Sequence, residues 1–222
     1  YDSSNRLTRQ IDELSRKTDY AYDSSHNLTR LIQRDASDTA LATTDYLYNS
    51  AGQRTRMTDP RGKIWNWLYD SSGNLTRQTD PLSNPTDFTW TTAGDREVVT
   101  DALGHKTKYF YDTDHRVTKV IYNFHLSAGD QAEQKFWYDC CLRLSQQDEN
   151  GNTTTFYYDA GHRLTNVVDA LGNETKTFYD KVGNVTRRRD ANLKDTDHLY
   201  DAANRLTKTI YPTTSVTELV EY

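Results

Sequence analysis

The hydrophobic and polar positions of this chain follow a repeat of about 21 residues. A Tyr-Asp dipeptide or a close variant recurs along the whole length, and Trp90 stands at the one position where the tyrosine is missing. We therefore divide residues 1–222 into a single array of ten units, which begin at Tyr1, Tyr22, Tyr48, Tyr69, Trp90, Tyr111, Tyr138, Tyr158, Tyr179 and Tyr200. The second and sixth units are longer by five or six residues, and repeat arrays place such insertions in loops.

Each unit carries two turn signals. Counting the tyrosine as offset zero, offset one is Asp in eight of ten units, and offset four is Gly, Asn or His in nine of ten. Gly, Asn and His tolerate positive φ, so the pattern predicts a type I turn closed by a G1 bulge, fixed by the Asp side chain. Gly52, Gly73, Gly94 and Gly183 should therefore have positive φ. The same chemistry returns midway through the unit at residues 59–62, 101–104, 148–151 and 169–172, with weaker copies at 80–83 and 190–193.

The pairing across the first turn predicts which residues share a face of the sheet. Offset zero should face offset six, which places the tyrosines beside an apolar stripe. That stripe is Leu7, Leu28, Leu75, Val117, Leu144, Leu164, Val185 and Leu206, interrupted by Arg54 and Arg96. Offset one should face offset five, which predicts the charge pairs Asp2–Arg6, Asp112–Arg116, Asp139–Arg143, Asp159–Arg163 and Asp201–Arg205.

Apolar residues also precede each tyrosine on both faces. Two residues before it stand Tyr20, Tyr46, Trp67, Phe88, Tyr109, Phe136 and Phe156. One residue before it stand Leu47, Leu68, Phe110, Trp137, Tyr157, Phe178 and Leu199, so neither face should be wholly open to water. The cationic residues at offset eight break the parity, and either a bulge resets the register or their long side chains reach past the core. These are Arg9, Arg30, Arg56, Arg77, Lys119, Arg187 and Lys208.

Composition supports an all-β chain without a conventional core. A mean hydropathy of -0.92 with 35% hydrophobic residues is poor core material, but 16 Tyr, 6 Phe and 4 Trp are too many aromatics for a disordered chain. We predict an antiparallel β-hairpin meander, with helix expected, if anywhere, only in the inserts at 35–43 and 123–132. Because sheets twist by about 20° per strand, this array is expected to wind into a spiralling shell or a solenoid-like array.

The chemistry-bearing residues follow the repeat and do not converge. His26, His115 and His162 share one turn position, and His105, His125 and His198 show no metal-ligand spacing, so we predict no metal site, no cofactor and no catalytic residue. Cys140 and Cys141 are read as a solvated thiol pair in a turn. Five Asn-x-Thr sequons are attributed to the repeat spacing in preference to glycosylation: Asn27, Asn74, Asn152, Asn173 and Asn184. The 27 basic and 32 acidic residues are scattered, which argues against nucleic-acid binding, and no apolar run is long enough for a membrane span.

The pattern YDxxGRLTxxxDxxGxxTxxxY, nearly complete in residues 158–179, resembles the YD repeat of the Rhs family. Relatives occur in insecticidal toxin complexes, bacterial wall-associated proteins and teneurins. The resemblance implies a secreted or cell-surface scaffold without enzymatic activity, a β-shell that in bacterial members encloses a C-terminal toxin. The alternative is an extracellular adhesin or fibre that binds a cell surface or carbohydrate.

The partners implied are flanking repeats of the same polypeptide or like chains, enclosed toxin cargo, and carbohydrate. Since the chain opens and closes within the repeat pattern, it is expected to be a fragment of a longer protein. Cutting a continuous sheet exposes two strand edges, so the isolated fragment should form end-to-end oligomers, with residues 1–21 and 200–221 fraying first.

Overall fold

The computed structural model describes residues 1–124, 126–127, 130–212 and 217–219, and these residues form an all-β structure. The described residues form twenty strands of one antiparallel sheet and include no α-helix. In the first half of the chain the strands are β1 (Arg9–Ile11), β2 (Lys17–Tyr22), β3 (Leu28–Arg34), β4 (Ala40–Tyr48), β5 (Arg54–Thr58), β6 (Ile64–Tyr69), β7 (Leu75–Thr79), β8 (Pro85–Trp90), β9 (Arg96–Thr100) and β10 (Lys106–Tyr111). They continue as β11 (Val117–Tyr122), β12 (Ala132–Tyr138), β13 (Arg143–Gln147), β14 (Thr153–Tyr158), β15 (Leu164–Val168), β16 (Glu174–Tyr179), β17 (Val185–Arg189), β18 (Asp195–Tyr200), β19 (Leu206–Ile210) and β20 (Thr217–Leu219).

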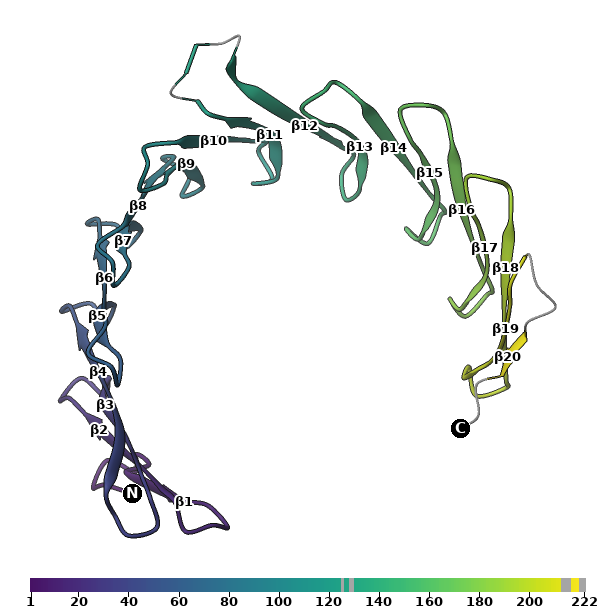
Figure 1. The fold of residues 1–222 in the computed structure, drawn as a ribbon. Coiled ribbons are helices and arrows are strands. Elements are labelled where there is room, and N and C mark those ends of the chain that lie inside the picture. The colour runs from purple at the N-terminus through teal and green to yellow at the C-terminus, as the bar shows by residue number, and fades with distance from the viewer. Residues whose placement is uncertain (125, 128–129, 213–216, 220–222) are drawn as a thin grey trace. The chain divides into compact units, whose positions relative to one another are not determined.

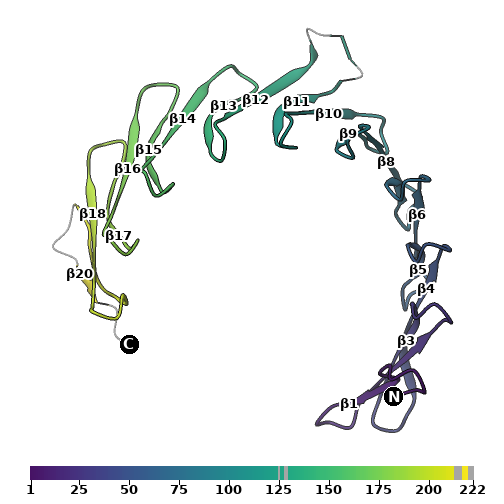
Figure 2. The ribbon, with the colours of Figure 1, turned by 180° about the vertical axis from the view of Figure 1, so that it is seen from behind.

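The strands follow one another as a meander, as the hairpin pattern predicted. From β1 to β10, each strand pairs antiparallel with the next. The same holds from β12 to β20. The chain contains two compact units, residues 1–109 with 122–129 and residues 110–121 with 130–222. Within each unit successive strands lie side by side in a single layer (Figures 1 and 2). The division into one array of ten repeats stays a prediction.

The first insert contains no helix. It lengthens the hairpin of β3 and β4 and closes in a turn, in which the Asp35 N–H donates to the Thr39 carbonyl and Asp38 has a φ of 71°. The second insert, residues 123–132, lies partly outside the described residues.

A β-bulge in the first hairpin of eight repeats explains the parity break at offset eight. In the hairpin of β2 and β3, Tyr22 faces Leu28, whereas Ala21 faces Arg30, so Thr29 is left without a partner in the ladder. The same register shift occurs just before Tyr48, Tyr69, Trp90, Tyr138, Tyr158, Tyr179 and Tyr200. The extra residue moves the offset-eight side chain to the face opposite the tyrosine. Of the two explanations left open by the sequence, the bulge is therefore the one the structure adopts.

Neither face of the sheet contains a conventional core. Among the described residues only Val120 and Thr209 are buried. In the row one residue before the tyrosines, every large apolar side chain except Phe110 is about half exposed, from 42% for Phe178 to 56% for Leu68. Neighbour-to-neighbour contacts along the sheet, and not a central core, must therefore hold the repeats together.

Candidate functional site: the contacts that join the repeats

The first turns have the predicted geometry. In the turn at Asp159, the Asp159 N–H donates to the Arg163 carbonyl (3.0 Å) and the His162 N–H donates to the Asp159 carbonyl (2.9 Å). The Asp159 Oδ1 atom accepts the N–H groups of Gly161 and Arg163 (2.9 and 3.0 Å). Positive φ at offset four is confirmed for Asn5, His26, Gly52, Gly73, Gly94, His115, His162, Gly183 and Asn204. The three turn histidines thus serve the backbone, each in the turn of its own repeat.

The second turns are built in the same way. Positive φ occurs at the closing residue of each predicted copy, which are Gly62, Ser83, Gly104, Gly151, Gly172 and Leu193. Two further second turns, missed from the sequence, close at Ser15 and Asp38. Asp12 and Asp35 begin these turns, and Ser15 closes the first of them as Ser83 closes the predicted copy at residues 80–83.

In most first turns that begin with aspartate, the second carboxylate oxygen binds the side chain at offset five. Arg6 Nε donates to Asp2 Oδ2 at 2.7 Å, and Arg116, Arg163 and Arg205 do the same with Asp112, Asp159 and Asp201. Four of the five predicted Asp–Arg pairs are thereby confirmed. The fifth, Asp139–Arg143, is wrong because the turn at Asp139 is one residue shorter, and Arg143 takes the offset-six place opposite Tyr138.

The sequon asparagines occupy the same clamp position. Asn27 Nδ2 donates to Asp23 Oδ2 at 3.0 Å, and the other four make the equivalent bond: Asn74 to Asp70, Asn152 to Asp148, Asn173 to Asp169 and Asn184 to Asp180. The amide nitrogen that a glycan would occupy is engaged in turn formation at all five positions. This supports the attribution of the sequons to the repeat.

These clamps hold the turn carboxylates ionised. The side-chain hydrogen bond from Arg163 lowers the pKa of Asp159, and the one from Asn27 lowers the pKa of Asp23. On the strands, ion pairing with Arg9 and then Arg34 lowers the pKa of Asp19 to about 2. No carboxyl group in these clamps has the raised pKa that would suit a general acid near neutral pH.

The clamp arginines also reach the next repeat. Arg6 Nη1 donates to the Asp23 carbonyl at 2.9 Å, and its guanidinium lies 4.8 Å from the centre of the Tyr22 ring. Arg163 does the same with the Asp180 carbonyl (3.0 Å) and the Tyr179 ring (4.7 Å). Each such arginine therefore links one turn to the next through a hydrogen bond and a cation–π contact.

The repeat tyrosine makes the second link. The Tyr22 hydroxyl donates to the Leu7 carbonyl of the preceding repeat at 3.0 Å. Equivalent bonds of 2.8–3.0 Å join Tyr48 to Leu28, Tyr69 to Arg54, Trp90 to Leu75, Tyr138 to Val117, Tyr158 to Arg143, Tyr179 to Leu164 and Tyr200 to Val185. The hydrophobic pattern groups the tyrosine with the apolar residues and does not predict this bond. A signal existed, because the position is always Tyr or Trp, which can donate, and never Phe.

The threonine at the bulge makes a third contact that the sequence analysis missed. Thr29 Oγ1 donates to the Ala21 carbonyl across the hairpin at 3.2 Å. The same bond is made by Thr76, Thr118, Thr165, Thr186 and Thr207. It satisfies a carbonyl beside the bulge, where the ladder is disrupted.

The arginines in the apolar stripe pack against aromatic rings. Arg54 lies over the rings of Tyr46 (5.8 Å) and Trp67 (4.6 Å), while Arg96 lies over the ring of Tyr109 (5.1 Å). Arg143 joins them, over Phe136 (5.9 Å) and Phe156 (5.1 Å). The prediction that Leu144 belongs to the apolar stripe is wrong. The shorter turn puts Arg143 in that place and leaves Leu144 41% exposed.

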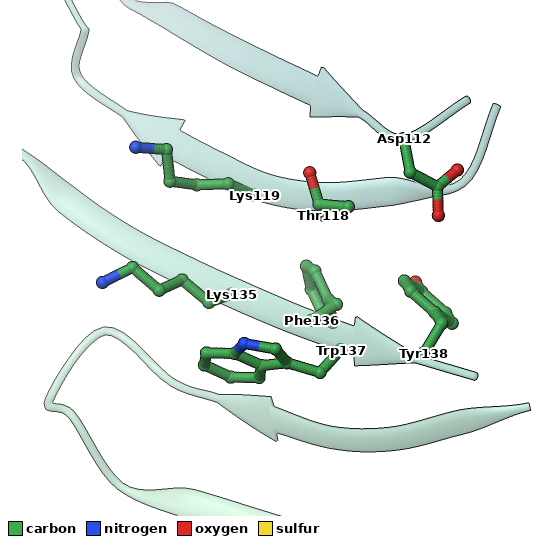
Figure 3. A pocket seen from close by; sticks show the side chains of 7 residues that line it. All are labelled: Asp112, Thr118, Lys119, Lys135, Phe136, Trp137 and Tyr138. Atoms are coloured by element: carbon green, nitrogen blue, oxygen red, sulfur yellow. The ribbon is translucent and has the colours of Figure 1, made fainter. Parts of the chain in front are cut away.

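A shallow pocket of about 340 Å³ lies between β11 and β12 (Figure 3). Asp112 lies at one end and Lys119 and Lys135 at the other, with Phe136 and Trp137 between them. The equivalent residues two repeats further, among them Asp159, Thr165, Phe178 and Tyr179, line a similar pocket. Since the pocket follows the repeat, it is a property of the sheet surface and not a unique active site.

The remaining candidate residues do not assemble into a chemical site. His105 Nδ1 lies 2.9 Å from its turn carboxylate Asp101 Oδ2, and His198 Nδ1 lies 3.3 Å from Thr209 Oγ1; His125 is outside the described residues. Cys140 and Cys141 are exposed thiols with their sulfur atoms 3.2 Å apart. Within the described ranges, no group of three or more His, Cys, Asp or Glu side chains could hold a metal ion.

None of the described elements is a helix of the length and apolarity that a bilayer crossing requires. A family model described as RHS Repeat matches residues 1–40, 69–104, 142–174 and 179–216, which together exceed half of the chain. No curated protein matches the sequence.

Several solved structures are similar in fold. TcdB2-TccC3 without its hypervariable C-terminal region has a TM-score of 0.65 at 19% identity, covering 100% of this chain and 14% of that chain. TcdB2-TccC3-TEV has a TM-score of 0.63 at 18% identity, and a Tc holotoxin pore of Photorhabdus luminescens has 0.61 at 19% identity; each match covers 96% of this chain and 14% of the other. At these identities the likeness establishes the fold alone.

Proposed function

Because this chain belongs to the RHS repeat family, we propose that it is a non-catalytic wall segment of a β-shell that encloses and helps deliver a toxin encoded C-terminal to the repeats. Its protein is then secreted or displayed at the cell surface. Its partners are flanking repeats of the same polypeptide and the enclosed cargo.

The observation that carries this proposal is that the repeat-defining polar groups are used to join neighbours. The repeat tyrosine bonds to the preceding repeat, and the clamp arginine bonds to the following one. The turn aspartates are engaged by backbone N–H groups and by the clamp side chains. Such a surface supports a wall, and among the residues that the structure describes no acid, base or nucleophile is set apart from the repeat.

The half-exposed apolar row supports an enclosed partner. Leu68, Trp137, Tyr157 and Phe178 present apolar area on a single-layer sheet, and rows of this kind usually mark an interaction surface. The similar TcdB2-TccC3 structure that lacks a hypervariable C-terminal region agrees with a variable segment beside the scaffold. This chain spans only 14% of those proteins, so the cargo itself belongs to the proposal.

An extracellular adhesin or fibre is the second candidate. It is favoured by the open pocket at Trp137, since an exposed aromatic ring beside Lys119 and Lys135 suits a sugar. The two candidates differ in what surrounds the repeats, so sequencing the flanking gene separates them. A variable domain directly downstream supports the shell, whereas a wall anchor supports the fibre.

Limited proteolysis of the complete gene product tests enclosure directly. The segment C-terminal to the repeats should resist protease while the repeats are intact and become sensitive once urea opens them. The control is the same segment expressed alone. If it is digested equally fast in both forms, the shell proposal is wrong.

A further inference from the structure

A second cavity, of about 470 Å³, lies between the second turns of two neighbouring repeats. Its lining includes Arg56 of β5, Lys63 just before β6 and Asn66 within β6. Thr79 at the end of β7 and Ser83 in the turn that follows β7 complete this part of the wall. Arg56, Asn66 and Thr79 face one another in the ladder across β5, β6 and β7, so their side chains leave the same face of the sheet. The cavity is therefore built by strand pairing and not by a loose loop.

The repeat itself shows what is unusual about Arg56. At the equivalent position, Arg30 pairs with Asp45, Arg77 with Asp87 and Arg187 with Asp197, each at 2.5 Å. In every case the carboxylate is the cross-strand partner of the arginine. The cross-strand partner of Arg56 is the neutral Asn66. Of these four arginines, only Arg56 faces a neutral amide in place of a carboxylate, and it therefore lacks the counter-charge that the other three have.

The Nε–H group of Arg56 has no acceptor in the described part of the chain. Its Nε atom is shielded from solvent and has no hydrogen-bond partner among the described residues. A shielded N–H donor without a partner is rare in folded proteins, and it is explained when a bound ion or water supplies the acceptor. A second cation, Lys63, lines the same cavity and makes no ion pair within the described part of the chain.

The one carboxylate of the cavity is occupied by its own turn. Asp80 Oδ1 accepts the N–H groups of Leu82 and Asn84, both at 2.8 Å, and Oδ2 accepts Asn84 Nδ2 at 2.9 Å. Asp80 therefore does not take the role that Asp87 has beside Arg77.

We infer that this cavity is an anion-binding site for a sulfate or phosphate group, held by Arg56 and Lys63. The two cations outnumber the one carboxylate of the cavity, and the guanidinium fork suits the oxygen atoms of a tetrahedral oxyanion. The hydroxyl groups of Thr79 and Ser83 and the amide of Asn66 supply further donors on the cavity wall. This site is independent of the proposed shell function.

The test is a titration of the 222-residue chain with sodium sulfate and with sodium phosphate at constant ionic strength. Isothermal calorimetry measures the affinity for the anion, and NMR of the arginine Nε–H groups shows which arginine the anion contacts. We expect one saturable site, with the largest shift at Arg56. Arg56→Gln and Lys63→Gln should each weaken binding about tenfold or more, because each removes a charged hydrogen-bond donor.

The matched control is Arg77→Gln, which removes the equivalent arginine from a repeat where Asp87 already neutralises it. This variant should bind sulfate like the parent chain. Equal weakening by Arg77→Gln, or a response to chloride equal to that for sulfate, would overturn the inference. Thermal unfolding of each variant verifies that it is folded, and Lys63→Gln lies in an exposed turn where a loss of fold is not expected.

The anion could be free or could be part of an acidic saccharide. A further titration with glucose 6-phosphate and glucose 6-sulfate distinguishes these two sources. Tighter binding of a sugar ester than of the free anion would assign the site to an acidic saccharide. Equal affinity would assign it to the free anion. Absence of saturable binding by all four probes would show that no such site exists.

Discussion

The turns at Asp159 and Asp139 start from the same Tyr-Asp dipeptide in neighbouring repeats and close in different ways. At Asp159 the backbone N–H donates to the carbonyl of Arg163 and closes the turn, and His162 has a φ of 62°. At Asp139 the Leu142 carbonyl accepts the Asp139 N–H, and Leu142 does not have positive φ. One residue fewer thus removes the need for a left-handed residue.

The comparison shows which features of the repeat tolerate change. In the shorter turn the ladder resumes with Tyr138 opposite Arg143 and Trp137 opposite Ser145, so the bulge is kept. The tyrosine link is kept too, because the Tyr158 hydroxyl bonds to the Arg143 carbonyl at 3.0 Å. The turn length varies, whereas the bulge and the tyrosine link persist. What is lost is the Asp–Arg clamp.

The largest expected difference between the two turns concerns the residue at offset four. His162→Val should destabilise the chain by about 1–2 kcal/mol, because a β-branched side chain is strained in the left-handed region. Leu142→Val should change stability by less than about 0.5 kcal/mol, as for an ordinary surface substitution. Urea unfolding followed by circular dichroism measures both. Equal losses would mean that the two turns share one backbone conformation.

The tyrosine link should have the same strength beside both turns. Tyr179→Phe removes the bond to the Leu164 carbonyl and Tyr158→Phe the bond to Arg143. Each should cost about 1 kcal/mol, the net value of one such hydrogen bond. The measurement is the urea midpoint of each variant against the parent chain. A loss for Tyr179→Phe without one for Tyr158→Phe would show that the short turn also weakens the link.

Much of the local fold could be predicted because turn chemistry is local. Asp at offset one and Gly, Asn or His at offset four determine the turn, and the structure places positive φ at Gly52, Gly73, Gly94 and Gly183 as predicted. The strand pairing followed from the same spacing. The position of Arg143 could not be predicted in this way. The sequence still shows Asp139 followed by Arg143 at the usual spacing, but the turn is one residue shorter, so Arg143 lies opposite Tyr138 and not opposite Asp139.

The contacts between repeats were harder to predict. The bond from Tyr22 to the Leu7 carbonyl joins backbone and side chain across 15 residues, and side-chain patterning alone does not locate a carbonyl. The bulge at Thr29 was only one of two interpretations of the cation at Arg30. Arg56 was recognisable in the sequence as one of a row, but its missing counter-charge became visible only when the register placed Asn66 opposite it.

Acid should affect the turn at Asp159 in a defined direction. The Arg163 side chain lowers the pKa of Asp159, so the turn contributes stability above the ordinary aspartate pKa of about 4, and this stability is lost as the pH falls through the lowered value. Asp159→Asn should therefore lower the urea midpoint at pH 7 and have little effect well below pH 3. An equal effect at both pH values would show that the carboxylate charge does not contribute.

The Asp139 turn provides the salt control for that experiment. Its carboxylate pKa is lowered chiefly by the backbone N–H groups of Cys141 and Leu142, with no arginine clamp in its own turn. High salt should consequently reduce the effect of Asp159→Asn more than that of Asp139→Asn.

The smallest expected effect concerns the rate at which the thiol of Cys140, in the short turn, is alkylated. The hydrogen bond between the two sulfur atoms raises the pKa of Cys140 most, followed by the charge of Cys141, by desolvation and then by the charge of Asp139. Cys140 should thus react slowly with iodoacetamide at pH 8, because the thiolate is the nucleophile. Cys141→Ala removes the neighbouring sulfur and should speed alkylation of Cys140 severalfold, as followed by mass spectrometry over time. Asp139→Asn should speed it less, since that carboxylate is a weaker cause than the neighbouring sulfur and the turn keeps its backbone hydrogen bonds. If Cys140 reacts at the rate of a free cysteine peptide in the parent chain and in both variants, the two sulfur atoms do not share a proton in solution.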